Sequence, residues 1–211
     1  MTACPLPPRP GAHCAGSRPA EVPVTTAAEI APLLDALEPF DGLEAEHRAD
    51  ALRWLATTGD IFRRVPPKTP PKHLVAYFLL HDAADGSAVL ALHRRAGLWL
   101  PTGGHVEVGE DPAETVRRET VEELGVPAVF ADAVARPLFV TVTGTTGATA
   151  ARHTDVSLWY LLAGLRTDEL HPDEREFRAV RWWSRKEIAT ADPRSLEPHL
   201  ARFLAKVDRG R

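Results

Sequence analysis

The chain has 211 residues, of which 44% are hydrophobic and 26% charged, which suits a globular protein with one substantial domain and an appendage. Its formal net charge of -4 gives no support to binding of a nucleic acid polymer. The longest apolar run, Leu74 to Leu80, has the length of a strand and is far shorter than the ~20 residues that span a bilayer, so we expect no membrane partner.

Residues 1–24 are rich in proline, glycine, alanine and serine and show no hydrophobic periodicity, so we expect a disordered tail. Both cysteines, Cys4 and Cys14, lie in this tail, whereas a disulfide framework needs more cysteines inside the fold. The tail also lacks the apolar stretch of a secretory signal. We therefore expect free thiols and a cytoplasmic protein.

Residues 25–65 are predicted to form a helical extension. Apolar residues at helical spacing between Ile30 and Leu37 predict a first helix, which Pro39 ends. A second helix is predicted from Leu43 to Leu55 and stops near Gly59. The extension is a candidate for covering one face of the main domain, for a homodimer contact or for closing over a pocket, and the residues do not rank these roles.

The proline-rich segment 66–71 cannot continue a helix or lie in a central strand, so it marks the start of a main domain over residues 66–211. Within this domain, the pattern predicts strands near 74–80, 88–94, 138–143, 156–162 and 179–183, an acidic helix over 112–124, and a closing helix over 196–207. Strands mixed with a few helices indicate an α/β or α+β domain.

The acidic helix has signals at both ends. Asp111 suits the N-cap, Pro112 the first helical position, and Glu114 completes a pattern like a capping box. Gly125 suits the position just after the last turn. The sequence therefore predicts a helix from Pro112 to Leu124 with an apolar stripe toward the core.

Three carboxylates, Glu119, Glu122 and Glu123, project within roughly a 100° arc of this helix. Like charges at this spacing oppose one another unless a cation offsets them, and a hard cation with oxygen ligands, Mg2+ or Mn2+, would do so. The alternative from the helix alone is a solvated acidic face balanced by Arg117 and Arg118.

The preceding loop favours the metal site. The glycine pair Gly103 and Gly104 allows close approach of the backbone to a ligand and exposes a carbonyl to a cation. Glu107 and Glu110 add carboxylates between the loop and the helix. Because Mg2+ commonly binds a few carboxylates together with substrate phosphates, we expect a phosphate-containing substrate.

The run from Gly104 to Val126 resembles the signature of the Nudix hydrolases. In that signature a glycine is followed by five residues, a glutamate, seven residues and then Arg-Glu-U-x-Glu-Glu-x-Gly-U, where U is apolar. The matching positions here are Gly104, Glu110, Arg118, Glu119, Glu122, Glu123, Gly125 and Val126. Thr120 departs from the pattern, where an aliphatic residue is usual, but its methyl group can still pack.

The resemblance extends over about residues 72–187. It implies an α-β-α sandwich around a mixed sheet and hydrolysis of a nucleoside diphosphate linked to a further moiety. It also implies that Glu119, Glu122 and Glu123 bind the metal together with the carbonyl of Gly103. Arg118 is then expected to orient Glu119.

Glu110 is expected to brace the motif through a salt bridge, between the structural glycines Gly104 and Gly125. Members of the family often take one more acid from a later loop. We expect this acid to be Glu176, with Glu174 as the alternative, while a solvated acidic loop is the other interpretation.

The proton acceptor for the attacking water is expected to be Glu122 or the loop acid. For substrate binding, the candidates are Arg94, Arg95, His153 and Asp155, each of which also suits an ordinary surface or turn position.

The substrate stays open, with a nucleoside triphosphate as the default and a metabolite diphosphate as an alternative. A non-catalytic nucleotide sensor is the main rival function, and the intact carboxylates count against it. An isopentenyl diphosphate isomerase would need a cysteine inside the domain, where the sequence has none.

Overall fold

The computed structural model describes residues 25–66, 68–145 and 152–210, so the tail predicted to be disordered lies outside the described residues. Five α-helices and seven strands form a mixed α+β fold, as predicted. The elements are α1 (Ala27–Asp35), α2 (Gly42–Leu55), β1 (Lys72–His81), β2 (Ala88–His93), β3 (Trp99–Leu100), β4 (Thr102–His105), α3 (Pro112–Leu124), β5 (Phe139–Gly144), β6 (Thr154–Ala163), β7 (Phe177–Trp183), α4 (Arg185–Thr190) and α5 (Leu200–Arg209).

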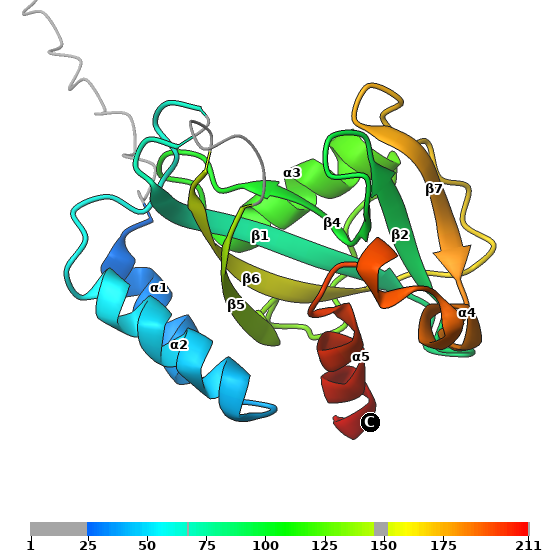
Figure 1. Cartoon of the computed structure of the whole chain (residues 1–211), viewed down its shortest axis with the longest axis horizontal. Coiled ribbons are helices and arrows are strands. Elements are labelled where there is room, and N and C mark those ends of the chain that lie inside the picture. Colours follow the sequence, from blue (N-terminus) through cyan, green and yellow to red (C-terminus); the bar gives the residue numbers. More distant parts are fainter. Residues whose placement is uncertain (1–24, 67, 146–151, 211) are drawn as a thin grey trace, which may run out of the picture.

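The strands form one mixed sheet with β1 near its middle (Figure 1). Its main path runs β3-β2-β1-β6-β5, while β4 pairs with β1 and β7 pairs with β2. The pairing of β1 with β6 is parallel and the other pairings are antiparallel. The parallel pair places His73 opposite Asp155, although 82 positions separate them in the chain.

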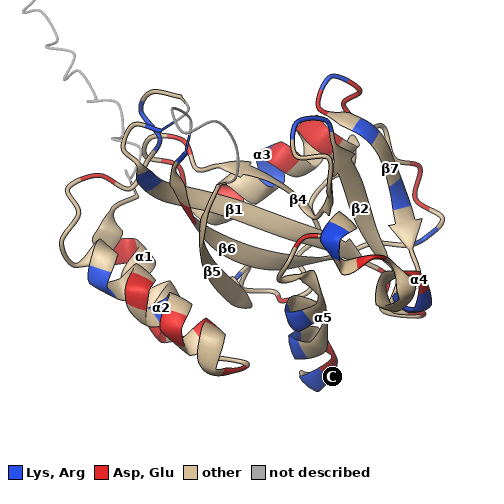
Figure 2. Cartoon of the chain, in the orientation of Figure 1, with Lys and Arg blue, Asp and Glu red and all other residues tan. Residues whose placement is uncertain are grey.

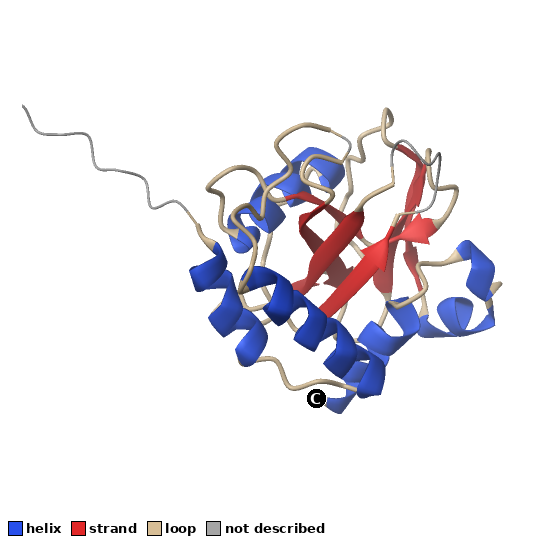
Figure 3. Ribbon diagram, turned by 60° about the vertical axis from the view of Figure 1, so that its left-hand side comes forward, coloured by secondary structure: helices blue, strands red, loops and turns tan. Residues whose placement is uncertain are grey.

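Alternate residues of β1 pack into two different hydrophobic clusters, because successive side chains of a strand point to opposite faces. Leu74 and Phe78 join the cluster that contains Val116 of α3 and the residues of α1 and α2. On the other face, Leu79 joins the cluster that contains Phe203 of α5. Helices therefore cover both faces of the sheet (Figure 3).

The predicted helical extension is present as α1 and α2, and charge pairs attach it to α5 at the other end of the chain. The Nζ of Lys206 lies 2.7 Å from the fully buried carboxylate of Glu44. The Nε of Arg202 donates to Asp41 across 2.8 Å. Figure 2 shows acidic residues along α2 and basic residues along α5. The extension thus covers part of the sheet and contacts the closing helix.

Two predicted boundaries need correction. The closing helix begins at Leu200 and not near Leu196, because Leu196 has extended backbone after a short 3-10 turn, Pro193–Ser195. The first helix ends at Asp35, earlier than Leu37. Among the described residues, no helix is both long enough and apolar enough to cross a bilayer.

Candidate active site

Helix α3 forms where its end signals predict. Asp111 accepts a hydrogen bond from the Ala113 amide across 2.8 Å, and Gly125 ends the helix in the left-handed conformation with a φ of 70°. Glu114 pairs with Arg117 across 3.1 Å and forms no capping box, which corrects that detail of the prediction. Thr120 is fully buried and donates its hydroxyl to the Val116 carbonyl, so it is accommodated in the apolar stripe.

Arg118 ties the loop before α3 to the carboxylates on it. Its Nε and Nη2 each lie 3.0 Å from a different oxygen of Glu110, which is a two-pronged contact. Its Nη1 lies 2.6 Å from Glu119 and 3.3 Å from Glu122. The Glu110 carboxylate raises the pKa of Arg118, so the guanidinium stays charged. Arg118 therefore holds Glu119 in place while Glu110 holds Arg118.

The two glycines of β4 let the carboxylates of α3 reach the strand backbone. A β-carbon on Gly104 would overlap the carboxylate of Glu119, and one on Gly103 would overlap the backbone of β1 at Ala76 and Tyr77. Gly103 also has a φ of 150°, which disfavours other residues. Its amide donates to Glu123 across 2.8 Å. These contacts are the physical reason for the glycine pair that the sequence presents.

Glu119 and Glu123 are carboxylates in a poorly solvated place. Burial, and next the charge of Glu119, raise the pKa of Glu123 to about 9, although the Gly103 amide acts in the opposite direction. Burial also raises the pKa of Glu119, and Arg118 offsets this in part. A divalent cation would relieve the cost of charging both groups, so this donor set fits a hard metal ion.

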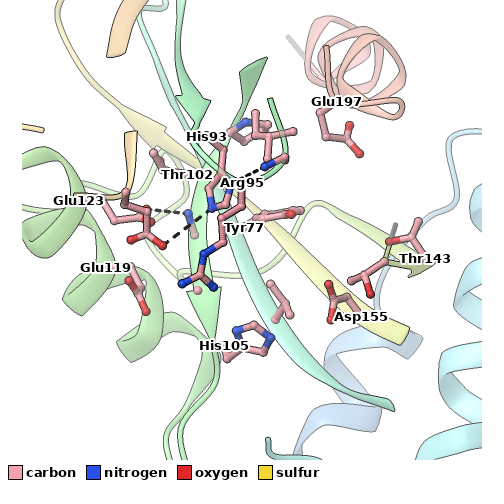
Figure 4. Close-up of a pocket in the computed structure, with 18 of the residues that line it drawn as sticks. Tyr77, His93, Arg95, Thr102, His105, Glu119, Glu123, Thr143, Asp155 and Glu197 are labelled. Atoms are coloured by element: carbon pink, nitrogen blue, oxygen red, sulfur yellow. Dashed lines mark hydrogen bonds and ion pairs between the residues drawn. The ribbon is translucent and has the colours of Figure 1, made fainter. Parts of the chain in front are cut away.

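A cavity of about 1080 Å³ opens beside these carboxylates (Figure 4). Glu119 and Glu123 lie on one side of it in Figure 4, with Asp155 and Thr143 on the other and His105 between them. Its size suits a nucleotide-sized ligand. The α3 carboxylates thus border a space that a phosphate-containing substrate can enter.

The structure brings some predicted site residues to the cavity and leaves others outside its lining. The predicted residues that line the cavity are Gly103, Gly104, Arg118, Glu119 and Glu123 of the motif, together with Arg95, Asp155 and Glu176. Glu176 lies close enough that its charge raises the pKa of both Glu119 and Glu123.

Four residues that were predicted for the site are not among those that line the cavity: Arg94, His153, Glu122 and Glu174. The Arg94 side chain instead donates to the Glu174 carbonyl across 2.8 Å.

Several lining residues were not predicted from the sequence, and Glu197 is the most notable. It is 9% exposed, and burial raises its pKa to about 7 against the hydrogen bonds from the amides of His199 and Leu200. Arg63, Tyr77, His93 and His105 also line the cavity. The local sequence, with Leu196 before it and Pro198 after it, gave no signal that singles out Glu197.

Residues 71–207 match the NUDIX domain family. In fold, the chain is similar to the dihydroneopterin triphosphate pyrophosphohydrolase of E. coli, with 12% identity and a TM-score of 0.52 over 72% of this chain and 100% of that one. It is also similar to a MutT protein from Methanosarcina mazei Go1, with 19% identity and a TM-score of 0.51 over 66% of this chain and 95% of that one. At these identities the two structures support the fold and carry no information about the substrate.

Proposed function

Because the chain belongs to the Nudix hydrolase family, whose members are pyrophosphohydrolases, we propose that it hydrolyses a nucleoside triphosphate with the help of Mg2+ or Mn2+. The observation that carries the proposal is the position of Glu119 and Glu123 at the border of a nucleotide-sized cavity. Both carboxylates are desolvated, and both are held by hydrogen bonds from Arg118 or Gly103. A solvated acidic surface would need neither the burial nor these contacts.

We assign the metal ligands to Glu119, Glu122 and Glu123, with the carbonyl of Gly103. The side chains of Glu119 and Glu122 are 14% and 58% exposed, and Glu123 is 4% exposed as a whole residue, so the set offers both buried and accessible oxygens. When bound, the metal neutralises charge that develops on the phosphate oxygens and acidifies a bound water. The chain itself supplies the orientation of these oxygens through Arg118 and Gly103.

For the proton acceptor we favour Glu176 over Glu122. Glu176 lines the cavity and lies within electrostatic reach of Glu119 and Glu123, whereas Glu122 is not among the lining residues. In the proposed reaction Glu176 takes a proton from a water molecule, which attacks one phosphorus in line, and the phosphate-containing group on the opposite side leaves. Arg95 and Arg63 line the same cavity and are our candidates for binding the substrate phosphates.

The part of the substrate beyond the phosphates is assigned to the opposite end of the cavity. Figure 4 shows Glu197 far from Glu119, with the Tyr77 side chain between them, and both residues line the cavity. A tyrosine ring can stack on a base, and a carboxyl group can accept hydrogen bonds from base amino groups. A planar nucleobase therefore suits this region better than an aliphatic diphosphate.

The proposal is tested with a panel of nucleoside triphosphates, nucleotide sugars, dinucleotides and aliphatic diphosphates, with Mg2+ or Mn2+, while release of phosphate and pyrophosphate is measured. We expect turnover of a triphosphate with pyrophosphate release, and none when EDTA is present. Turnover of an aliphatic diphosphate alone would overturn the substrate assignment. Nucleotide binding without any turnover would instead support the sensor function.

A further inference from the structure

Four metal-binding side chains converge on the face of the sheet opposite α3. They come from β1, from β4 and from the start of β6, and we call them the histidine cluster: His73, His105, His153 and Asp155. Each offers a ligand atom, and these atoms all lie within 4.8 Å of one another. None of the four belongs to the Nudix motif's set of glutamates.

The cluster results from strand pairing. His73 lies opposite Asp155 in the parallel pair of β1 and β6, and His105 lies opposite Val75 in the antiparallel pair of β1 and β4. Residues two apart on a strand share a face, so His73 and Val75 point the same way, as do His153 and Asp155. Four imidazole or carboxylate groups therefore meet over three neighbouring strands.

Three of the ligand atoms are shielded from solvent without a hydrogen bond of good geometry among the described residues: Nε2 of His73, Nε2 of His105 and Oδ1 of Asp155. The Asp155 oxygen has only ion-pair contacts, with His73 and His153. The side chain of His73 is completely buried. Leaving such buried groups unpaired costs free energy, so their convergence calls for a ligand that accepts lone pairs.

The hydrogen bonding of His73 suits a metal ion. Nδ1 of His73 lies 2.8 Å from the Pro70 carbonyl, which can only accept, so Nδ1 carries the proton and Nε2 presents its lone pair. Metal ions bind the neutral imidazole.

The distances also suit a small tetrahedral ion. With metal–nitrogen bonds of about 2.0–2.1 Å, tetrahedral ligands lie about 3.3–3.4 Å apart. Oδ1 of Asp155 lies 3.2 Å from Nε2 of His153 and 3.5 Å from Nε2 of His73. His73 and His153 are stacked at an interplanar angle of 26°, and both rings present Nε2 to the same Asp155 oxygen.

We propose that the histidine cluster binds one Zn2+-like divalent cation, separate from the hard cation at the α3 carboxylates. Three imidazoles and one carboxylate match zinc and its neighbours, whereas Mg2+ prefers oxygen ligands. Four protein ligands fill all the coordination positions of a tetrahedral ion, so no position is open for water or substrate and the ion takes no part in the hydrolysis. Its role is structural, because it links β1, β4 and β6 beside the cavity. The positive charge of Arg63, which acts on His73, His105 and Asp155, opposes the ion and limits its affinity.

The test uses the full chain, stripped with EDTA and titrated with Co2+, whose visible absorption reports the number and kind of ligands. We expect one equivalent of Co2+ to bind with the strong visible absorption of tetrahedral coordination. Zn2+ should displace this Co2+ and abolish the absorption, whereas excess Mg2+ should leave it unchanged. In D155N and in H105N the binding should weaken at least tenfold. It should be unchanged in the matched control H171N, because His171 is exposed and lies away from the cluster.

A second pair of variants separates this site from the Nudix carboxylates and from surface binding. E123Q should retain the tetrahedral Co2+ signal, and R63Q should bind Co2+ more tightly than wild type. Circular dichroism in EDTA checks that each variant is folded. The proposal is overturned when D155N and H105N, both folded, bind Co2+ like wild type, or when E123Q alone removes the signal.

Discussion

The backbone amide of Gly103 donates to the carboxylate of Glu123 across 2.8 Å, so a residue without a side chain holds the most buried acid of α3. This contact connects the glycine pair of β4 to the proposed metal site. Both residues line the cavity, together with Asp155 from β6.

Glu123→Gln keeps an oxygen for the Gly103 amide but removes the charge. We expect turnover to fall by more than ~10²-fold, since charge stabilisation in the transition state is lost. In EDTA near pH 7.5 the variant should unfold at a higher temperature than wild type. With its pKa raised to about 9, Glu123 must stay protonated in the folded state at a pH where the unfolded chain ionises it, and glutamine removes that cost. Thermal unfolding and kcat are measured, with E114Q on the exposed face of α3 as control. Near-wild-type turnover would contradict the metal assignment.

Gly104→Ala places a β-carbon where the Glu119 carboxylate lies. Displacement of a metal ligand by about 1 Å is expected to lower kcat by ~10²-fold while the circular dichroism spectrum stays the same. The control is G59A, because a β-carbon on Gly59 has no neighbour within 4 Å. Equal kcat values for the two variants would show that Glu119 is not needed in this position.

Arg118→Lys removes the two-pronged contact with Glu110 and leaves a single point charge. We expect the free energy of unfolding to fall by about 1.5–3 kcal/mol, the usual size for hydrogen bonds to charged groups, and kcat/KM to fall with it. Urea unfolding and steady-state kinetics measure both. R117K is the control, since Arg117 pairs with Glu114 on the exposed face. A loss of the same size in both variants would refute a special role for Arg118.

Glu176→Gln tests the proton acceptor. A general base contributes typically ~10²–10⁴-fold, so kcat should fall by that factor. Glu174→Gln, in the same loop but outside the cavity lining, should leave kcat unchanged. If E176Q is active and E122Q is not, the base is Glu122 and our preference is wrong.

Glu197 should make stability depend on pH. Its pKa is raised from the ordinary 4.5 to about 7 by burial, so the folded state holds a proton that the unfolded state releases. The contribution of Glu197 to stability is therefore greatest below pH 4.5 and declines as the pH rises to about 7, by about 3 kcal/mol. In urea unfolding between pH 4.5 and 8, wild type and the exposed control E169Q should lose stability relative to E197Q by this amount. Parallel curves for all three proteins would exclude Glu197 as the source.

The amino-acid sequence by itself determined α3 and its neighbours, because their signals are local. Asp111, Pro112 and Gly125 specify the ends of the helix within one or two turns, and the spacing of Glu119, Glu122 and Glu123 follows from the helical repeat. The long spaced match to the Nudix signature then supplied the family, which the NUDIX domain match over residues 71–207 confirmed.

Only the tertiary structure decided which distant residues share a site. His73 and Asp155 meet because β1 and β6 pair in parallel, and the register of that pairing depends on burial of both faces of the sheet, not on any local pattern. Glu197 reaches the cavity because the chain turns back over the sheet before α5. Such contacts join residues far apart in the chain, so hydrophobic periodicity and capping signals could not have predicted them.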